Sequence, residues 1–85
     1  MDSSESNLVS GRQLRAARVL TGLTQVQLSK EAGFNPRACR YWEGRGENPP
    51  TTAPQSLAAI ERVLRHHGVE VFCQPTPGCR LSSMK

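Results

Sequence analysis

The fold is decided by residues 24–44, which read TQVQLSKEAGFNPRACRYWEG. Thr24 and Gln27 have the spacing of a capping box, in which two side chains satisfy free backbone N–H groups where a helix begins. Gly33 marks the end of that helix, because glycine readily adopts the left-handed conformation that often follows a helix C-terminus. The first half of the stretch therefore predicts a short helix over Gln25–Ala32.

The second half of the stretch predicts another helix almost immediately. Asn35 is an N-cap residue, and Pro36 suits the first helical turn because a missing N–H costs nothing there. Cys39 and Trp42 are three residues apart and form an inward stripe. We predict this helix over Pro36–Gly44. Two short helices joined by a short turn containing glycine have the geometry of a helix-turn-helix.

Two more helices flank this pair. The capping-box spacing recurs at Ser10–Gln13 and at Thr52–Gln55. Each pair is followed by apolar residues at helical spacing and then by a glycine, which predicts helices over Gly11–Thr21 and Ala53–His67. Beyond them, Val69–Phe72 alternates apolar and polar residues with β-branched character, which suits a short strand or an extended packing segment.

These elements divide the chain into four parts. The polar residues 1–9 predict a flexible N-terminal arm. Residues 10–68 form the helix-turn-helix domain, and residues 69–73 are the short strand or packing segment. Residues 74–85 contain prolines, glycine and serines and predict a disordered tail. The expected fold is all-α, with four to five helices and a short C-terminal extended segment.

Length and composition restrict the function. With 85 residues the chain holds one compact domain and leaves no room for a separate catalytic domain. It has no glycine-rich phosphate loop, nucleophile elbow or paired carboxylates, so we do not expect an enzyme. No apolar run approaches the roughly 20 residues of a membrane span, and the polar beginning lacks the features of a secretion signal. We therefore expect a cytoplasmic protein with no membrane span.

The cysteines and histidines suggest neither a disulfide framework nor a metal site. Three cysteines are an odd number, which disfavours a disulfide framework in a reducing compartment. Cys39 has the spacing of a core residue and predicts a buried, unreactive thiol. His66, His67, Cys73 and Cys79 offer zinc-binding atoms, but the two cysteines are too widely spaced for a typical structural site and adjacent helical histidines diverge. We expect no metal and no cofactor.

The charge of the chain points to its partner. A formal net charge of +4 favours an anionic partner, which leaves nucleic acid, an anionic membrane or an acidic protein. Once the inward stripe is assigned, the outward positions of the third predicted helix are Arg37, Arg40 and Tyr41, with Arg45 just beyond. Such a face suits phosphates and base edges. The alternatives are a solvated helix face for the arginines and a half-buried surface aromatic for Tyr41.

Two stretches of the sequence resemble a known family. Residues 14–33 read LRAARVLTGLTQVQLSKEAG, and residues 41–44 read YWEG. Together they are similar to the phage repressor and Cro family, also called the xenobiotic-response-element (XRE) family, over about residues 10–68. The resemblance implies a lambda-repressor-like DNA-binding domain, in which the third helix enters the major groove of double-stranded DNA.

The resemblance also implies roles for individual residues. Gln25 matches a family glutamine that contacts a DNA phosphate. Asn35, Pro36, Arg37 and Tyr41 match positions at which the family reads bases, and Arg37 can donate two hydrogen bonds to guanine. Pro36 departs from the polar residues usual at its position, which leaves it contact with a thymine methyl or a role in starting the helix.

The last implied features are an ion pair and a dimer. Arg18 and Glu43 match a family pair in which an arginine of the first helix holds a glutamate that closes the third. The implied function is a transcriptional regulator, a repressor that binds a palindromic operator as a homodimer, because one helix-turn-helix contacts only a half-site. The alternative is a module of the same fold that binds a protein, such as an antitoxin or an antiactivator. The basic outward face favours DNA.

Overall fold

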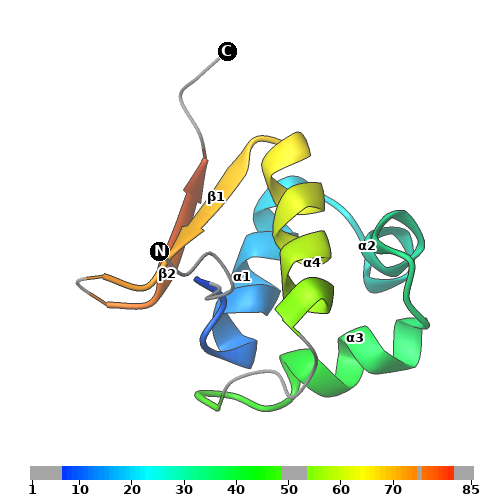
Figure 1. Ribbon diagram of the computed structural model, residues 1–85, viewed down its shortest axis with the longest axis horizontal. Helices are drawn as coiled ribbons and strands as arrows, with labels where there is room; N and C mark the ends of the chain where they lie inside the picture. The colour runs from blue at the N-terminus through cyan, green and yellow to red at the C-terminus, as the bar shows by residue number, and fades with distance from the viewer. Residues whose placement is uncertain (1–6, 49–53, 75, 82–85) are drawn as a thin grey trace.

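The computed structural model describes residues 7–48, 54–74 and 76–81. Within these ranges the chain forms four helices followed by a two-stranded antiparallel sheet (Figure 1). None of the described helices is both long and apolar enough to cross a lipid bilayer. The helices are α1 (Gly11–Thr21), α2 (Gln25–Ala32), α3 (Pro36–Glu43) and α4 (Pro54–His66), and the strands are β1 (Val69–Phe72) and β2 (Gly78–Leu81).

The starts of the first three helices lie where their caps predict. Thr24 and Gln27 make both hydrogen bonds of a capping box, and the Ser10 and Asn35 side chains each accept from a backbone N–H of the first helical turn. The bounds of α1 and α2 are confirmed, whereas α3 and α4 each end one residue earlier than predicted. Residues 52 and 53, part of the predicted start of α4, lie outside the described residues.

The prediction of a mostly helical fold is confirmed, and β1 forms where a short strand was predicted. The fold is not purely all-α, however, because β2 forms inside the segment expected to be a disordered tail. In this hairpin Val69 pairs with Leu81 and Phe72 pairs with Gly78. Composition favoured a tail, but β2 gains backbone hydrogen-bond partners from β1 and also packs against α1. Residues 82–85 lie outside the described part of the chain.

The N-terminal boundary also differs from the prediction of a flexible arm over residues 1–9. Leu8 is only 2% exposed and belongs to the hydrophobic core. The Asn7 backbone N–H donates to the Glu61 carboxylate of α4 at 3.0 Å. Burial of a single leucine therefore extends the folded domain to residues before Ser10. The rest of the expected arm, residues 1–6, lies outside the described residues.

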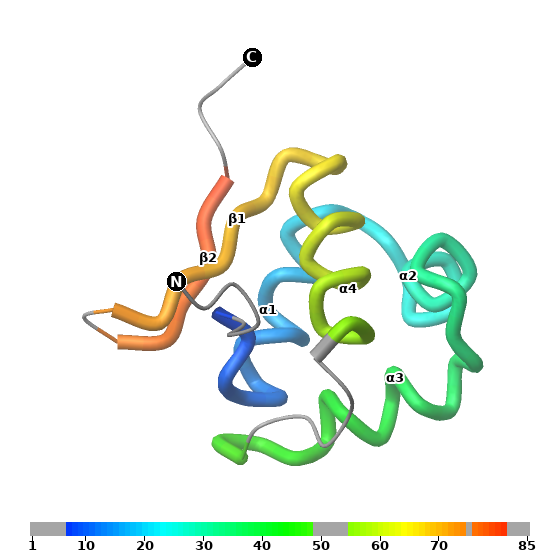
Figure 2. Tube along the Cα trace, viewed as in Figure 1, coloured from blue at the N-terminus to red at the C-terminus, as the bar shows by residue number. Residues whose placement is uncertain are grey.

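The core is built around α1, which contacts α3, α4 and both strands. Figure 2 shows the hairpin on one side of α1. Helices α4 and α2 lie on the opposite side of α1, and α3 lies across one end. This arrangement leaves α2 and α3 side by side, away from the hairpin. The buried apolar residues come from every described helix and from β1, with one residue preceding α1: Leu8, Leu14, Ala17, Leu28, Cys39, Trp42, Ile60, Leu64, Val69 and Val71.

Gln13 attaches the hairpin to α1. Its side-chain Nε2 donates to the backbone carbonyls of Asn7 at 2.8 Å, Phe72 at 2.7 Å and Gly78 at 3.0 Å. Its Oε1 accepts from the backbone N–H of Val9 at 2.8 Å. The side chain is buried, so these bonds satisfy polar groups that water does not reach. One glutamine thereby joins the N-terminal segment, α1 and both ends of the hairpin loop.

A three-residue turn, Gly33 to Asn35, joins α2 to α3. Gly33 has a φ of +87°, a left-handed conformation that side chains with a Cβ rarely adopt. Phe34 packs edge-on against Trp42 of α3, with 5.2 Å between ring centres. Backbone geometry and an aromatic contact thus fix the direction in which α3 leaves α2.

Candidate nucleic-acid interface

The outward side of α3 carries most of the predicted site residues. Asn35, Pro36, Arg37, Arg40 and Tyr41 are all exposed, and we call this set the α3 face. The inward stripe is buried as predicted, with its cysteine 2% and its tryptophan 6% exposed. A helix whose two sides differ in this way is fixed in rotation, because a turn about its axis would expose the stripe to water. The α3 face is therefore held outward by packing.

The charges of Arg37 and Arg40 are not compensated within the described part of the chain. Neither guanidinium lies within ion-pair distance of a described carboxylate, whereas five other basic side chains do. Both side chains are exposed and keep all their N–H donors available to a ligand. Such groups attract anions, and the planar guanidinium suits bidentate acceptors such as phosphate or guanine.

Asn35 and Tyr41 each have part of their hydrogen-bonding capacity occupied. The Asn35 Oδ1 accepts from the Arg37 backbone N–H at 2.8 Å as the cap of α3, which leaves its amide donors for a partner. The Tyr41 hydroxyl accepts from Arg45 Nη1 at 3.2 Å, and the Arg45 guanidinium lies 5.8 Å from the centre of the Tyr41 ring. Tyr41 is 57% exposed.

The predicted ion pair between Arg18 and Glu43 is present and joins α1 to α3. Arg18 Nε donates to Glu43 Oε2 at 2.6 Å and Arg18 Nη2 donates to Glu43 Oε1 at 3.1 Å, a bidentate geometry. Arg18 Nη1 also donates to the Leu23 carbonyl at 2.9 Å. The two side chains are 15% and 4% exposed. Hydrogen bonding to Glu43 raises the pKa of Arg18 against the opposing effect of burial.

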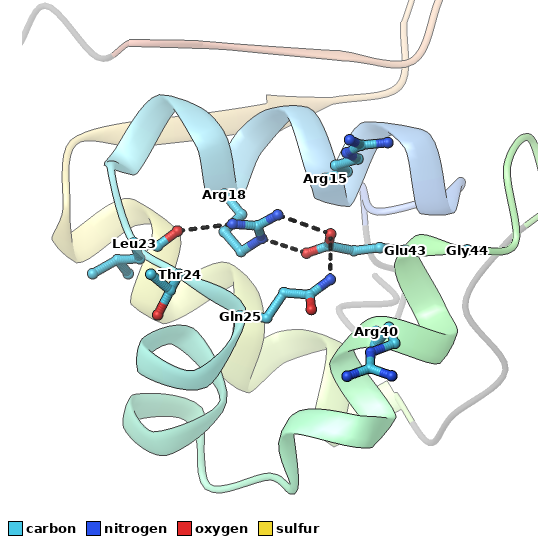
Figure 3. Close-up of a pocket in the computed structure, with 8 residues that line it drawn as sticks. All are labelled: Arg15, Arg18, Leu23, Thr24, Gln25, Arg40, Glu43 and Gly44. Carbon is cyan, nitrogen blue, oxygen red and sulfur yellow. Dashed lines mark hydrogen bonds and ion pairs between the residues drawn. The ribbon is translucent and has the colours of Figure 1, made fainter.

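Gln25 is the third member of this network. Its Nε2 donates to Glu43 Oε1 at 3.0 Å, so one carboxylate holds groups from α1, α2 and α3 together (Figure 3). Its carbonyl oxygen points away from Glu43 in this view. The family resemblance implied a phosphate contact for Gln25, together with support of a neighbouring base contact. It did not indicate the bond to Glu43, which is eighteen residues away in the chain. Its observed contact is with the protein.

Arg15 belongs to this site but was missed by the sequence-based reasoning. It lines a pocket of about 510 Å³ between α1, α2 and α3. Arg18, Gln25 and Glu43, which form the network, also line this pocket (Figure 3). A helical repeat places Arg15 one turn before Arg18, and that spacing was the available signal. The remaining lining residues are Leu23, Thr24, Arg40 and Gly44.

The cysteines and histidines do not form a metal site within the described residues. No three side chains of His, Cys, Asp or Glu come together there in a way that could hold an ion. All three cysteines are free thiols, and burial raises the pKa of both Cys39 and Cys79. Both therefore favour the neutral thiol at neutral pH, which is the less reactive form.

This region thus offers exposed hydrogen-bond donors and positive charge to a ligand. The α3 face presents guanidinium and amide donors, and the adjoining pocket adds further arginines. No protein-family model matches the sequence, and no curated protein matches it.

Proposed function

We propose that this protein is a sequence-specific DNA-binding transcriptional regulator with a lambda-repressor-like helix-turn-helix domain of the phage repressor and Cro type. One observation carries the proposal: the exposed α3 face is cationic, and Glu43 anchors its helix to both neighbouring helices. The short turn between α2 and α3 supports the same conclusion, because a helix-turn-helix uses its first helix to support the second against DNA.

In this proposal α3 enters the major groove, which is wide enough to admit a helix. Arg37 lies near the N-terminus of α3, where recognition helices contact base edges, and its guanidinium matches O6 and N7 of guanine. Asn35 contributes amide donors, and Tyr41 contributes a ring and a hydroxyl one turn farther along. Pro36 has no N–H to donate and lies in the first turn of α3, where it starts the helix. Its ring leaves it an apolar contact with DNA, such as packing on a thymine methyl.

Preorganisation is what the Arg18–Glu43–Gln25 network contributes to binding. A recognition helix that is already fixed in the free protein loses little conformational freedom when it binds. The bidentate ion pair is mostly buried, so salt screens it less than it screens a surface pair. The α3 face therefore keeps its position at the salt concentrations at which DNA binding is measured.

The regulator acts as a homodimer on a palindromic operator. A single helix-turn-helix contacts one half-site, and two-fold symmetry doubles the contact area on DNA. Binding over a promoter would exclude polymerase, so repression is the expected outcome in the cell, where the protein works in the cytoplasm.

Selection from a pool of random duplexes tests this function directly. The wild-type protein should enrich a palindrome with half-sites about one helical turn apart, and gel shifts should then give a specific complex. Arg62 of α4 is exposed and lies outside the pocket, so Arg62→Ala is a matched control for loss of one positive charge. It should enrich the same palindrome. Absence of any enriched sequence at low salt contradicts the proposal.

A further inference from the structure

The pocket between α1, α2 and α3 carries an excess of positive charge. Three arginines line it, Arg15, Arg18 and Arg40, against a single carboxylate, that of Glu43. Arg18 and Glu43 neutralise each other through their two hydrogen bonds. The charges of Arg15 and Arg40 remain, because neither side chain lies within ion-pair distance of a described carboxylate.

The two remaining arginines lie on opposite walls of this pocket. Arg15 projects from α1 and Arg40 from α3, with the Arg18–Glu43–Gln25 network between them (Figure 3). Both side chains are exposed and long, so their guanidinium groups can swing over the network toward one ligand. The Arg18–Glu43–Gln25 network is held by its own hydrogen bonds. The exposed Arg15 and Arg40 side chains can change rotamer above it.

The chemistry of the pocket fits a phosphodiester. Guanidinium groups donate paired hydrogen bonds to phosphate oxygens, and two of them facing one singly charged phosphate supply more donors than a lone side chain. The pocket also opens beside the N-terminus of α2, where Thr24 and Gln25 line it and backbone N–H groups add a weaker attraction for anions.

We propose that Arg15 and Arg40 form a clamp that binds one backbone phosphate of DNA across this pocket. The proposal rests on the function proposed above and deepens it, because it assigns a phosphate contact to α1 and α3 together. Contacts to phosphate carry no base information but set the orientation and register of a protein on the duplex. The clamp would thus fix how deeply α3 lies in the groove.

Arg15→Ala and Arg40→Ala test the clamp through affinity and its salt dependence. Each variant should weaken binding to the selected palindrome and to unrelated duplexes by a similar factor, roughly three- to tenfold. Loss of one guanidinium from the clamp should also make the slope of log K against log salt less negative, by at most about 0.9. Arg62→Ala is the charge-matched control and should retain more affinity than either variant. Unchanged urea midpoints would show that both variants remain folded.

A chemical substitution in the DNA identifies the phosphate. In a set of duplexes, each carries a neutral methylphosphonate in place of one phosphate, at a different position in each duplex. At one of these positions, wild type, Arg15→Ala and Arg40→Ala should bind with equal affinity. Different insensitive positions for the two variants would overturn the clamp, as would variants that bind as tightly as Arg62→Ala. If wild type selects a palindrome and the variants bind normally, only the clamp fails. If wild type binds no duplex, the proposed function fails with it.

Discussion

Glu43 links α3 to the two helices that precede it in the chain. Its carboxylate accepts from Arg18 of α1 and Gln25 of α2, and its side chain is 4% exposed. An ion pair buried to this extent adds little stability over an apolar pair of the same shape, because both charges lose their hydration. Removal of one partner is different, since it leaves the other charge buried without compensation.

We expect Glu43→Ala to lower the free energy of unfolding by about 3 to 5 kcal/mol, because Arg18 loses its partner while it stays mostly buried. Urea unfolding followed by circular dichroism measures this change. The double variant Arg18→Met/Glu43→Leu should recover most of the loss, since apolar groups of similar volume need no partner. A loss below about 1 kcal/mol for Glu43→Ala would mean that Arg18 turns into solvent instead.

Arg37 and Arg45 should differ in how their loss affects DNA binding. Arg37 lies on the α3 face, so Arg37→Ala should cost about 1 to 3 kcal/mol at one base pair and relax the preference there. Arg45 lies beyond the helix and its guanidinium contacts the Tyr41 ring, so Arg45→Ala should weaken all duplexes alike and reduce the salt slope. Competition with single-base operator variants measures both effects. Identical behaviour would refute this division between base reading and phosphate contact.

At the level of the helices, α1 can approach α3 closely because Gly11, the first residue of α1, has no side chain. A Cβ built on Gly11 would overlap the Trp42 backbone carbonyl oxygen, so the start of α1 lies directly against the end of α3. The Gly11 backbone N–H also donates to the Asn48 carbonyl at 2.9 Å, which ties the loop after α3 to α1. Only glycine allows these two backbones to come so close.

Gly11→Ala should therefore be strongly destabilising, by about 3 kcal/mol or more, because the clash involves backbone rather than a movable side chain. Gly44→Ala is a suitable control at the same junction. A Cβ there would meet its nearest atom, the Arg40 carbonyl oxygen, at 3.4 Å, and the Gly44 φ is −77°. Thermal unfolding of the two variants should give a much larger decrease in Tm for Gly11→Ala. Equal decreases would contradict the close approach.

At the scale of the whole molecule, the hairpin belongs to the domain that presents α3. Val69 is 1% and Val71 8% exposed, and Gln13 depends on two hairpin carbonyls as acceptors. A truncation after Gly68 would expose this part of the core and remove two of the three acceptors of the buried Gln13 Nε2. The hairpin thus cannot be treated as a removable tail.

Truncation after Gly68 should unfold the protein or shift its urea midpoint far downward, because it removes two buried valines and their partners together. Circular dichroism at low denaturant gives the helix content of the truncated chain. Truncation after Leu81 is the control and should leave the helix content unchanged, because it keeps both strands. A fully helical, cooperatively unfolding chain that ends at Gly68 would refute this role of the hairpin.

Features that depend on neighbours in the chain could be predicted from the amino-acid sequence. The caps at Ser10, Thr24 and Asn35 predicted where three helices begin, since a cap and the N–H groups it satisfies lie within one turn. The inward stripe of α3 was also predictable, because helical periodicity selects one face. The outward positions of Arg37, Arg40 and Tyr41 followed from that stripe.

Features that depend on residues far apart in the chain could be seen only in the three-dimensional structure. Strand β2 exists because β1 and α1 offer it partners, and Gln13 reaches a carbonyl 65 residues away. The pairing of Gln25 with Glu43 likewise follows from how α2 packs against α3, and the place of Arg15 in the pocket follows from how α1 packs against α3. Local sequence patterns do not predict such contacts, because the faces on which two helices meet are set by how the helices pack in three dimensions.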